Sequence, residues 1–287
     1  MKRFLLFIFC LYQLSAFGQH SFSNAVSEYY QNAYLWNPAM AGANHTKFYA
    51  LFNNSWWGFE GSARLIDFSF DMPFAKKMGA GIMLSSFSSG VFDQYTGSLS
   101  YAYQIEWSEE NRLRLGGSLS FYKAHLDTKE LSNNGEMDPI ISTFNEKSLQ
   151  LDGGLGAYLQ LHAFSIGLSG YNLSNYFQRA NQQKSNWEIG QLQASYQFSI
   201  QENKFSLQPL IAYQIFRATK NIFMGAIQFT YPALFDASIY WQSTGSIMGG
   251  LGLILNPDLE INFFYTSKNK YGYQEQYEAG IKYMLNP

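Results

Sequence analysis

The sequence predicts an all-β protein: a closed antiparallel transmembrane β-barrel of about 14 strands that follows a short N-terminal periplasmic segment. Three observations predict this fold class. Hydrophobic and polar residues alternate with period two, aromatic residues gather near the ends of the alternating runs, and the connections between runs alternate in length. Strands with one apolar and one polar face explain all three.

The composition excludes several classes of protein. Of 287 residues, 47% are hydrophobic, 18% aromatic and 14% charged, whereas soluble domains average about 25% charged residues. A net charge of −2 without a basic cluster excludes a polybasic nucleic-acid binder. The mean hydropathy is −0.19, and past residue 14 no apolar run approaches the ~18 residues of a spanning helix. A bundle of membrane helices is therefore excluded.

Residues 1–18 have the pattern of a secretory signal peptide. Two basic residues begin it, an apolar run covers 4–14, and a small-residue cleavage pattern ends at Gly18. A lipoprotein anchored at Cys10 is the alternative, and it fits less well because Cys10 lies inside the apolar run. Cys10 is the only cysteine, so the mature chain is predicted to contain no disulfide and no thiol ligand.

The run 94–107 shows the alternation most clearly. Its odd positions are apolar or small and its even positions are polar or small, as in a strand with one apolar face. The apolar side consists of Tyr95, Gly97, Leu99, Tyr101, Tyr103, Ile105 and Trp107. The same pattern recurs over 149–161, 259–266 and 277–285.

Runs of this kind predict the whole wall of the barrel. The expected strands lie near 47–57, 61–71, 77–88, 93–107, 111–125, 148–161, 163–172, 186–200, 204–217, 219–231, 233–243, 244–256, 258–267 and 275–285. Several match or exceed the ~9–11 residues that a transmembrane strand needs and exceed the ~5–6 that are typical of soluble strands. A soluble multi-sheet β protein is the alternative architecture.

The residues at strand ends and the lengths of the connections favour a membrane barrel over a soluble β protein. Aromatic residues at these ends fit interfacial girdles; they are Trp56, Trp57, Trp107, Trp187, Tyr231, Trp241, Tyr265 and Tyr283. If the first strand starts in the periplasm, the short turns 108–111, 201–203 and 256–258 lie there, and the long loops 126–147, 173–185 and 267–274 lie outside. Lipid offers no partner to a free strand edge, so the last strand is expected to pair with the first.

Motifs that carry chemistry are scarce. The histidines after the signal, His20, His45, His125 and His162, lack the short spacing of a zinc site. No Gly-x-Ser-x-Gly elbow occurs, and the Gly-Gly-Leu-Gly runs at 153–156 and 249–252 have the wrong spacing for a nucleotide loop. The sequence therefore predicts no catalytic residues, no metal and no cofactor.

The segment 19–46 precedes the first strand and differs from the rest. It contains several aromatic residues followed by the N-P-A-M-A-G motif at 37–42. Pro38 holds Asn37 extended, and Gly42 permits a tight turn. Two interpretations stay open: a structural lead-in packed against the periplasmic rim, or a plug or docking element that faces a periplasmic partner.

Several short motifs, taken in order, resemble one known family. They are Glu28-Tyr29-Tyr30-Gln31-Asn32, Asn37-Pro38-Ala39-Met40-Ala41-Gly42 (N-P-A-x-A-G), Asn54-Ser55-Trp56-Trp57, Phe70-Asp71-Met72-Pro73 (F-D-x-P), Gly79-Ala80-Gly81, Tyr101-Ala102-Tyr103 (Y-A-Y), Asp138-Pro139 and the run 167–173. Their order resembles the PorP/SprF-type outer-membrane proteins that accompany the type IX secretion system of Bacteroidetes. The resemblance spans nearly the whole chain, although the family's Arg-x-Gln before Trp57 is missing.

The resemblance implies a role and a place in the cell. It implies a non-enzymatic barrel, 47–287, in the outer membrane of a Bacteroidetes-like Gram-negative bacterium. Its partners would be outer-membrane lipid, type IX secretion components and a secreted cargo or adhesin protein, such as a gliding-motility adhesin, whose secretion or surface anchoring it assists. The family-like motif residues Asn37, Pro38, Ala39 and Gly42 are the predicted partner-binding residues.

Other functions remain to be compared with this one. The N-P-A element also resembles the plug of fatty-acid-transporter-type barrels, which implies passage of small hydrophobic solutes. A barrel enzyme would need a serine and a histidine, such as His125 or His162, to meet across strands. A soluble secreted β protein is the last alternative.

Overall fold

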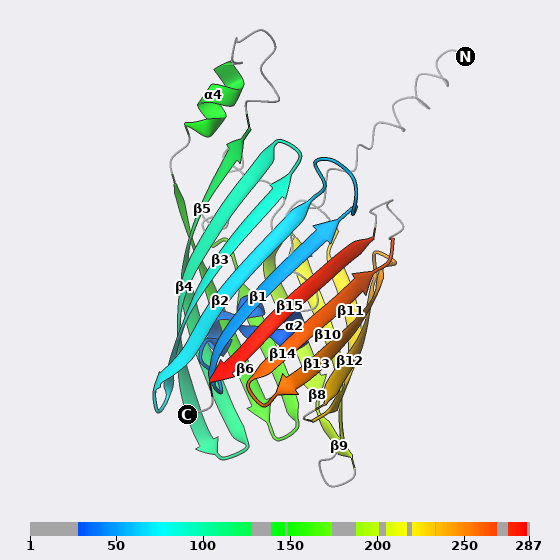
Figure 1. The fold of residues 1–287 in the computed structure, drawn as a ribbon. Coiled ribbons are helices and arrows are strands. Elements are labelled where there is room, and N and C mark those ends of the chain that lie inside the picture. The colour runs from blue at the N-terminus through cyan, green and yellow to red at the C-terminus, as the bar shows by residue number, and fades with distance from the viewer. Residues whose placement is uncertain are drawn as a thin grey trace, which may run out of the picture.

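The computed structural model describes residues 28–127, 139–146, 149–173, 188–200, 205–216, 220–232, 234–268 and 275–285. The predicted signal peptide at 1–18 and the first residues of the segment 19–46 lie outside the described residues, as do Trp187 and Asp138. The described chain is one antiparallel sheet rolled into a tilted barrel, with short helices inside it (Figure 1).

The strands follow one another around the wall. Their bounds are β1 Thr46–Ser55, β2 Arg64–Ala75, β3 Met78–Ser89, β4 Phe92–Ser108, β5 Asn111–Leu126, β6 Gln150–Leu161, β7 Phe164–Gly170, β8 Glu188–Tyr196, β9 Phe198–Ile200, β10 Phe205–Phe216, β11 Ile222–Tyr231, β12 Phe235–Gln242, β13 Ile247–Asn256, β14 Leu259–Thr266 and β15 Gln276–Leu285. The helices are α2 Glu28–Gln31, α3 Ala33–Trp36, the 3-10 helix η1 Pro38–Met40, and α4 Pro139–Asn145.

The barrel closes as the sequence predicts. β15 pairs with β1 from Leu285 opposite Thr46 to Gln276 opposite Ser55. β8 and β9 both pair with β10 and are separated only by Gln197, so they form one interrupted strand, and the wall counts fourteen strands. The prediction of a closed antiparallel barrel of about 14 strands is confirmed, with one strand broken near its end.

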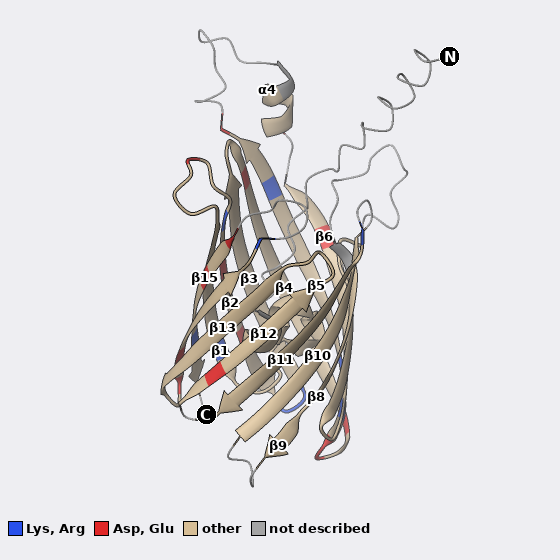
Figure 2. Cartoon of the chain, turned by 90° about the vertical axis from the view of Figure 1, so that its right-hand side faces the viewer, with Lys and Arg blue, Asp and Glu red and all other residues tan. Residues whose placement is uncertain are grey.

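The two faces of the strands differ as the alternation predicts. On β4, Leu99 is 50% exposed on the outer face, whereas its neighbour Ser98 is only 6% exposed because it faces the interior. The outer face repeats this pattern all round the barrel, with exposed Leu, Ile, Phe and Tyr side chains. Figure 2 shows long stretches of the wall without charged residues. An apolar exterior over a polar interior is the reverse of a soluble protein and suits lipid.

The two ends of the barrel differ in their connections. At one end, which we call the short-turn end, consecutive strands are separated by only two to four residues, at 76–77, 109–110, 162–163, 201–204, 232–234 and 257–258. The other, the long-loop end, contains the connections 56–63, 90–91, 127–149, 171–187, 217–221, 243–246 and 267–275. Helix α4 stands on the long-loop end, and β15 ends at the other (Figure 1). The predicted asymmetry is confirmed, and it suits periplasmic turns opposite extracellular loops.

Aromatic residues mark both ends of the wall. Trp56, Trp57, Trp241 and Tyr265 are exposed at the long-loop end, and Trp107, Tyr231 and Tyr283 are exposed at the short-turn end. Their amphipathic rings suit the two interfaces of a bilayer. No helix in the described part of the chain is both long and apolar enough to span a bilayer.

Candidate functional site

The described part of the N-terminal segment, from residue 28 onward, lies inside the barrel. Helices α2, α3 and η1 pack within the lumen, and Figure 1 shows α2 behind the strands, toward the short-turn end. Tyr34, Leu35 and Trp36 are buried there. We call residues 28–42 the plug.

The local fold of the plug follows from its sequence. Asn37 is extended, as expected before a proline, and its side-chain oxygen accepts a 2.9 Å hydrogen bond from the Ala39 backbone N–H. Pro38 begins η1, where its missing N–H costs nothing. Gly42 has a φ of 58°, a left-handed conformation that glycine tolerates. The motif is therefore a capped turn, which fixes the direction of the chain as it enters β1.

The barrel wall has a row of small residues against which this turn packs. The strand register aligns Gly79, Ala102, Gly116 and Gly156 in one row across β3, β4, β5 and β6. We call this row the glycine row. A Cβ at Gly79, Gly116 or Gly156 would collide with the backbone or side-chain atoms of Ala41, Ala39 or Asn37, respectively. The plug backbone thus contacts the wall so closely that only small residues fit.

Arg114 also binds the plug, from the inward-facing position two residues before Gly116 on β5. Its Nε donates to the Ala39 carbonyl at 2.7 Å, and its Nη2 donates to the Ala41 carbonyl at 2.7 Å. Its Nη1 donates to Gln104 Oε1 at 2.6 Å, and the residue is only 3% exposed. The planar guanidinium presents its donors in a rigid fork, so it can bind two plug carbonyls together.

Two further wall contacts fix the ends of the motif. Asn37 Nδ2 donates to the carbonyls of Ala157 on β6, at 3.0 Å, and Leu168 on β7, at 3.3 Å. At the other end, Asp71 Oδ2 accepts from the Gly42 N–H at 3.0 Å. Five hydrogen bonds therefore hold the motif along the wall from β7 to β2.

The structure places the four predicted site residues together. Asn37 is 1% exposed and Ala39 is 0% exposed. Pro38 and Gly42 are also buried. All four contact the inner wall or cap the turn that does so. Their predicted contact with a partner protein stays a prediction.

Sequence reasoning missed the wall residues that hold the motif. Arg114 gave a usable signal, because a charged residue on the interior face of a barrel strand needs a buried partner. Gly79 and Asp71 appeared only as parts of the family motifs, Gly156 only within the Gly-Gly-Leu-Gly run at 153–156, and no motif distinguished Gly116. Nothing in the sequence shows that these residues, far apart along the chain, form one row.

The helical end of the plug contacts the opposite wall through side chains. Gln31 Nε2 donates to Asp236 Oδ1 at 3.2 Å, and Lys282 Nζ donates to Gln31 Oε1 at 3.0 Å. Lys282 also pairs with Glu260, with 2.6 Å between Nζ and Oε2. The Tyr30 hydroxyl donates to the Gln208 carbonyl at 2.7 Å. The plug therefore bridges the lumen from β10, β12 and β15 to β2–β7.

Two plug tyrosines are hydrogen-bonded phenols. Burial raises the pKa of Tyr30 above its ordinary value and raises the pKa of Tyr34 to about 12. Both therefore stay protonated and can donate, and the Tyr34 hydroxyl donates to Ser100 Oγ at 3.2 Å.

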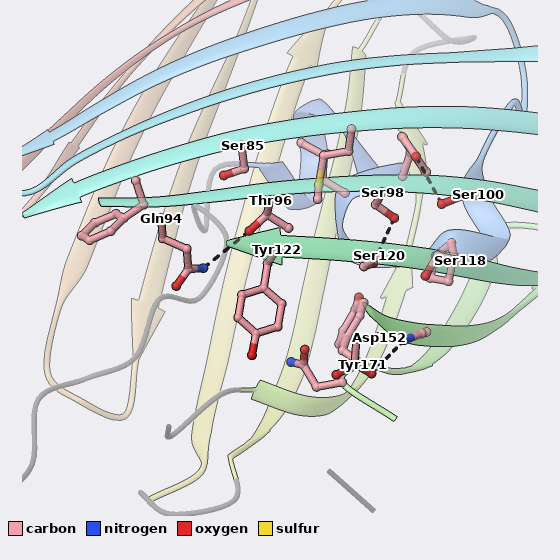
Figure 3. A pocket seen from close by; sticks show the side chains of 18 of the residues that line it. Ser85, Gln94, Thr96, Ser98, Ser100, Ser118, Ser120, Tyr122, Asp152 and Tyr171 are labelled. Atoms are coloured by element: carbon pink, nitrogen blue, oxygen red, sulfur yellow. Dashed lines mark hydrogen bonds between the residues drawn. The ribbon is translucent and has the colours of Figure 1, made fainter. Parts of the chain in front are cut away.

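A cavity of about 180 Å³ lies beside the plug, toward the long-loop end. Tyr34, Leu35 and Pro38 form its floor. Its wall contains many hydroxyl groups from β3, β4 and β5, and Figure 3 shows them beside Tyr122 and Asp152. Within the described residues, no three His, Cys, Asp or Glu side chains could share a metal ion.

Fold, lipid-facing surface and plug together define the class: an outer-membrane β-barrel whose lumen contains its own N-terminal segment. Residues 19–283 match the family model described as the type IX secretion system membrane protein PorP/SprF. The chain belongs to this family, as its motifs indicated, and the family and fold are those of secretion-associated or channel-like outer-membrane barrels. No curated protein sequence matches the chain significantly.

Solved outer-membrane barrels share the fold. The CymD monoaromatic hydrocarbon channel superposes with a TM-score of 0.55 at 12% identity, over 94% of this chain and 96% of that chain. Omp33 of Acinetobacter baumannii gives 0.52 at 7% identity, over 84% and 99%. The Pseudomonas putida toluene transporter TodX gives 0.50 at 10% identity, over 88% and 92%. At such identities the likeness shows the fold alone.

Proposed function

We propose that this chain is a non-enzymatic accessory barrel that assists the type IX secretion, or the surface anchoring, of a cargo or adhesin protein. The anchored plug is the observation that carries this proposal. A segment held by Arg114, Asn37 and Asp71 across the lumen makes the barrel a poor conduit. Family membership supplies the link to type IX secretion.

The barrel ends are then the surfaces available to partners. In this proposal the N-terminal segment and the short-turn end face the secretion components in the periplasm. The long-loop end faces the cargo. Asn37, Pro38, Ala39 and Gly42 act by holding the plug against the wall and fixing the direction of the chain as it enters β1.

Gene deletion in the native host tests the role. The cargo is expected to stay in the cell or to be shed, as measured by proteomics of the cell surface and the culture fluid. Complementation should succeed with the wild-type gene and with Gly117→Val, whose side chain has space. It should fail with Gly116→Val, whose side chain displaces the plug. Surface cargo unchanged by the deletion would overturn the proposal.

Passage of small hydrophobic solutes is the second candidate function. The fold likeness to a hydrocarbon channel and a toluene transporter favours it. The hydroxyl-rich wall of the cavity disfavours it, because apolar solutes bind in apolar pockets. Loss of toluene uptake in the deletion strain, with normal cargo at the surface, would favour this function over secretion.

We also propose that the chain reaches the outer membrane after cleavage near Gly18. N-terminal sequencing of the protein purified from outer membranes tests this, with Gln19 as the expected first residue. A lipid-modified Cys10 would instead support the lipoprotein alternative.

A further inference from the structure

The cavity on the long-loop side of the plug has a regular wall. The register sets Ser100 opposite Ser118, and one step farther along the strands it sets Ser98 opposite Ser120. A third step sets Ser85 opposite Thr96. These six hydroxyl groups cover neighbouring positions on β3, β4 and β5 (Figure 3). Such small side chains keep this part of the lumen open.

Part of this hydroxyl wall has no hydrogen-bond partner among the described residues. Ser98 and Ser120 bond each other at 3.2 Å, and Ser100 accepts from Tyr34. Within the described part of the chain, no hydrogen bond is formed by the hydroxyls of Ser85 and Ser118, which line the same cavity. A hydroxyl is both donor and acceptor, so this surface can bond another hydroxyl-bearing molecule in either direction.

Aromatic rings and one acidic side chain complete the site. The rings that line the cavity belong to Tyr34, Phe87, Tyr122 and Tyr171. Apart from these tyrosines, Asp152 is the one ionisable residue in the described lining. None of the described lining residues is Lys, Arg or His, so the site offers no positive charge to a phosphate or a fatty-acid carboxylate. Rings beside hydroxyls suit a ligand that has apolar C–H faces and a polar edge.

The size of the cavity limits the ligand. A volume of about 180 Å³ accommodates roughly a dozen water-sized positions, close to the number of heavy atoms in one hexose. The plug closes the floor, so a ligand entering from the long-loop end would be retained and not passed through. We propose that this cavity binds one neutral saccharide unit presented from the long-loop side of the barrel.

The test uses the full mature protein, purified in detergent. Binding of methyl glycosides of glucose, galactose, mannose and N-acetylglucosamine is measured by calorimetry or by saturation-transfer NMR. Oligosaccharides that end in the same residue form a second arm. Equal or tighter binding of the oligosaccharide indicates the end of a glycan, whereas binding of the single unit alone indicates a free sugar; both agree with the proposal.

Three variants locate the site. The double variant Ser85→Ala and Ser118→Ala removes two hydroxyls without breaking a described hydrogen bond, and it should weaken binding about ten- to a hundredfold. Ser85→Phe fills the cavity and should abolish binding. Ser238→Ala removes a buried hydroxyl of the opposite wall, outside the cavity lining, and should leave binding unchanged.

Several outcomes would overturn the proposal. One is that no saccharide binds to the wild-type protein at tens of millimolar while its heat-modifiable mobility shows a folded barrel. Another is that the serine double variant and Ser85→Phe bind as tightly as the wild type, which would place the sugar elsewhere. Binding of toluene in place of every saccharide would show an apolar site. The test needs no secretion assay, so its result is independent of the proposed function.

Discussion

The two walls of the lumen hold the plug by different chemistry. Strands β2–β7 contact chiefly its backbone, although they also bond the side chains of Tyr34 and Asn37: the glycine row lies against the turn, and Arg114 binds the Ala39 and Ala41 carbonyls. Strands β10, β12 and β15 contact its side chains, chiefly Gln31. Backbone contacts need particular small residues at fixed positions, whereas side-chain contacts can adjust. We therefore expect the motif end to be rigid and the helical end to tolerate change.

Strand length varies around the barrel, and the longest described strands lie among those that contact the motif. β4 and β5 have 17 and 16 residues, whereas β12 and β14 have 8 each. β4 and β5 therefore extend farther than these strands, and with β3 they also carry the hydroxyl groups of the cavity. One half of the barrel contains both the firm anchor of the plug and the candidate ligand site.

Deleting residues 28–42 should have the largest effect. Without the plug the lumen lacks its only described transverse segment, so single-channel conductance in planar bilayers should rise on the order of tenfold toward that of an open barrel. The wild-type protein at the same protein-to-lipid ratio is the control. Equal conductance would mean that the plug does not limit passage.

Gly116→Val should be the most damaging single substitution. Its side chain would meet the backbone of Pro38 and Ala39, so the turn must move, at a cost of about 3 kcal/mol. Urea unfolding in lipid vesicles measures the loss. Gly117→Val is the matched control, because the nearest atoms to a Cβ there lie at 3.8 Å. Equal losses in both variants would show that strand propensity, and not the plug, sets the effect.

Arg114→Lys should cost less, about 2 kcal/mol in the free energy of unfolding. Lysine keeps the charge but lacks the fork that binds two carbonyls, so one buried acceptor loses its partner. Arg112→Lys on the same strand, where the half-buried guanidinium bonds Gln160, should cost under about 0.5 kcal/mol. If both variants lose equally, the charge alone anchors the plug.

Among the substitutions at the contacts between plug and wall, Gln31→Leu should cost least, about 1 kcal/mol. It removes the bonds to Asp236 and Lys282, but Gln228 still donates to Asp236, and Glu260 still pairs with Lys282. The same urea unfolding assay measures it. A loss as large as that of Gly116→Val would contradict the difference between the two walls.

The sequence predicted the barrel but only part of the site. Alternation over 94–107 predicts the faces of β4 because side chains of a strand alternate whatever it pairs with. The N-P-A-M-A-G motif stands out because proline and glycine restrict or free the backbone locally. The wall positions that contact the motif were not predicted. Gly79, Gly116 and Gly156 lie side by side under the motif only when the strands are paired in register.

The chain by itself determined its strands, its lipid-facing surface, its aromatic ends and its family, since these depend on local periodicity and motif order. Only the tertiary structure decided that the plug lies within the lumen, that Arg114 binds it, and that serines of three strands surround one cavity. Those features depend on inter-strand register, which aligns residues far apart in the sequence. The sequence of a single strand does not specify that register.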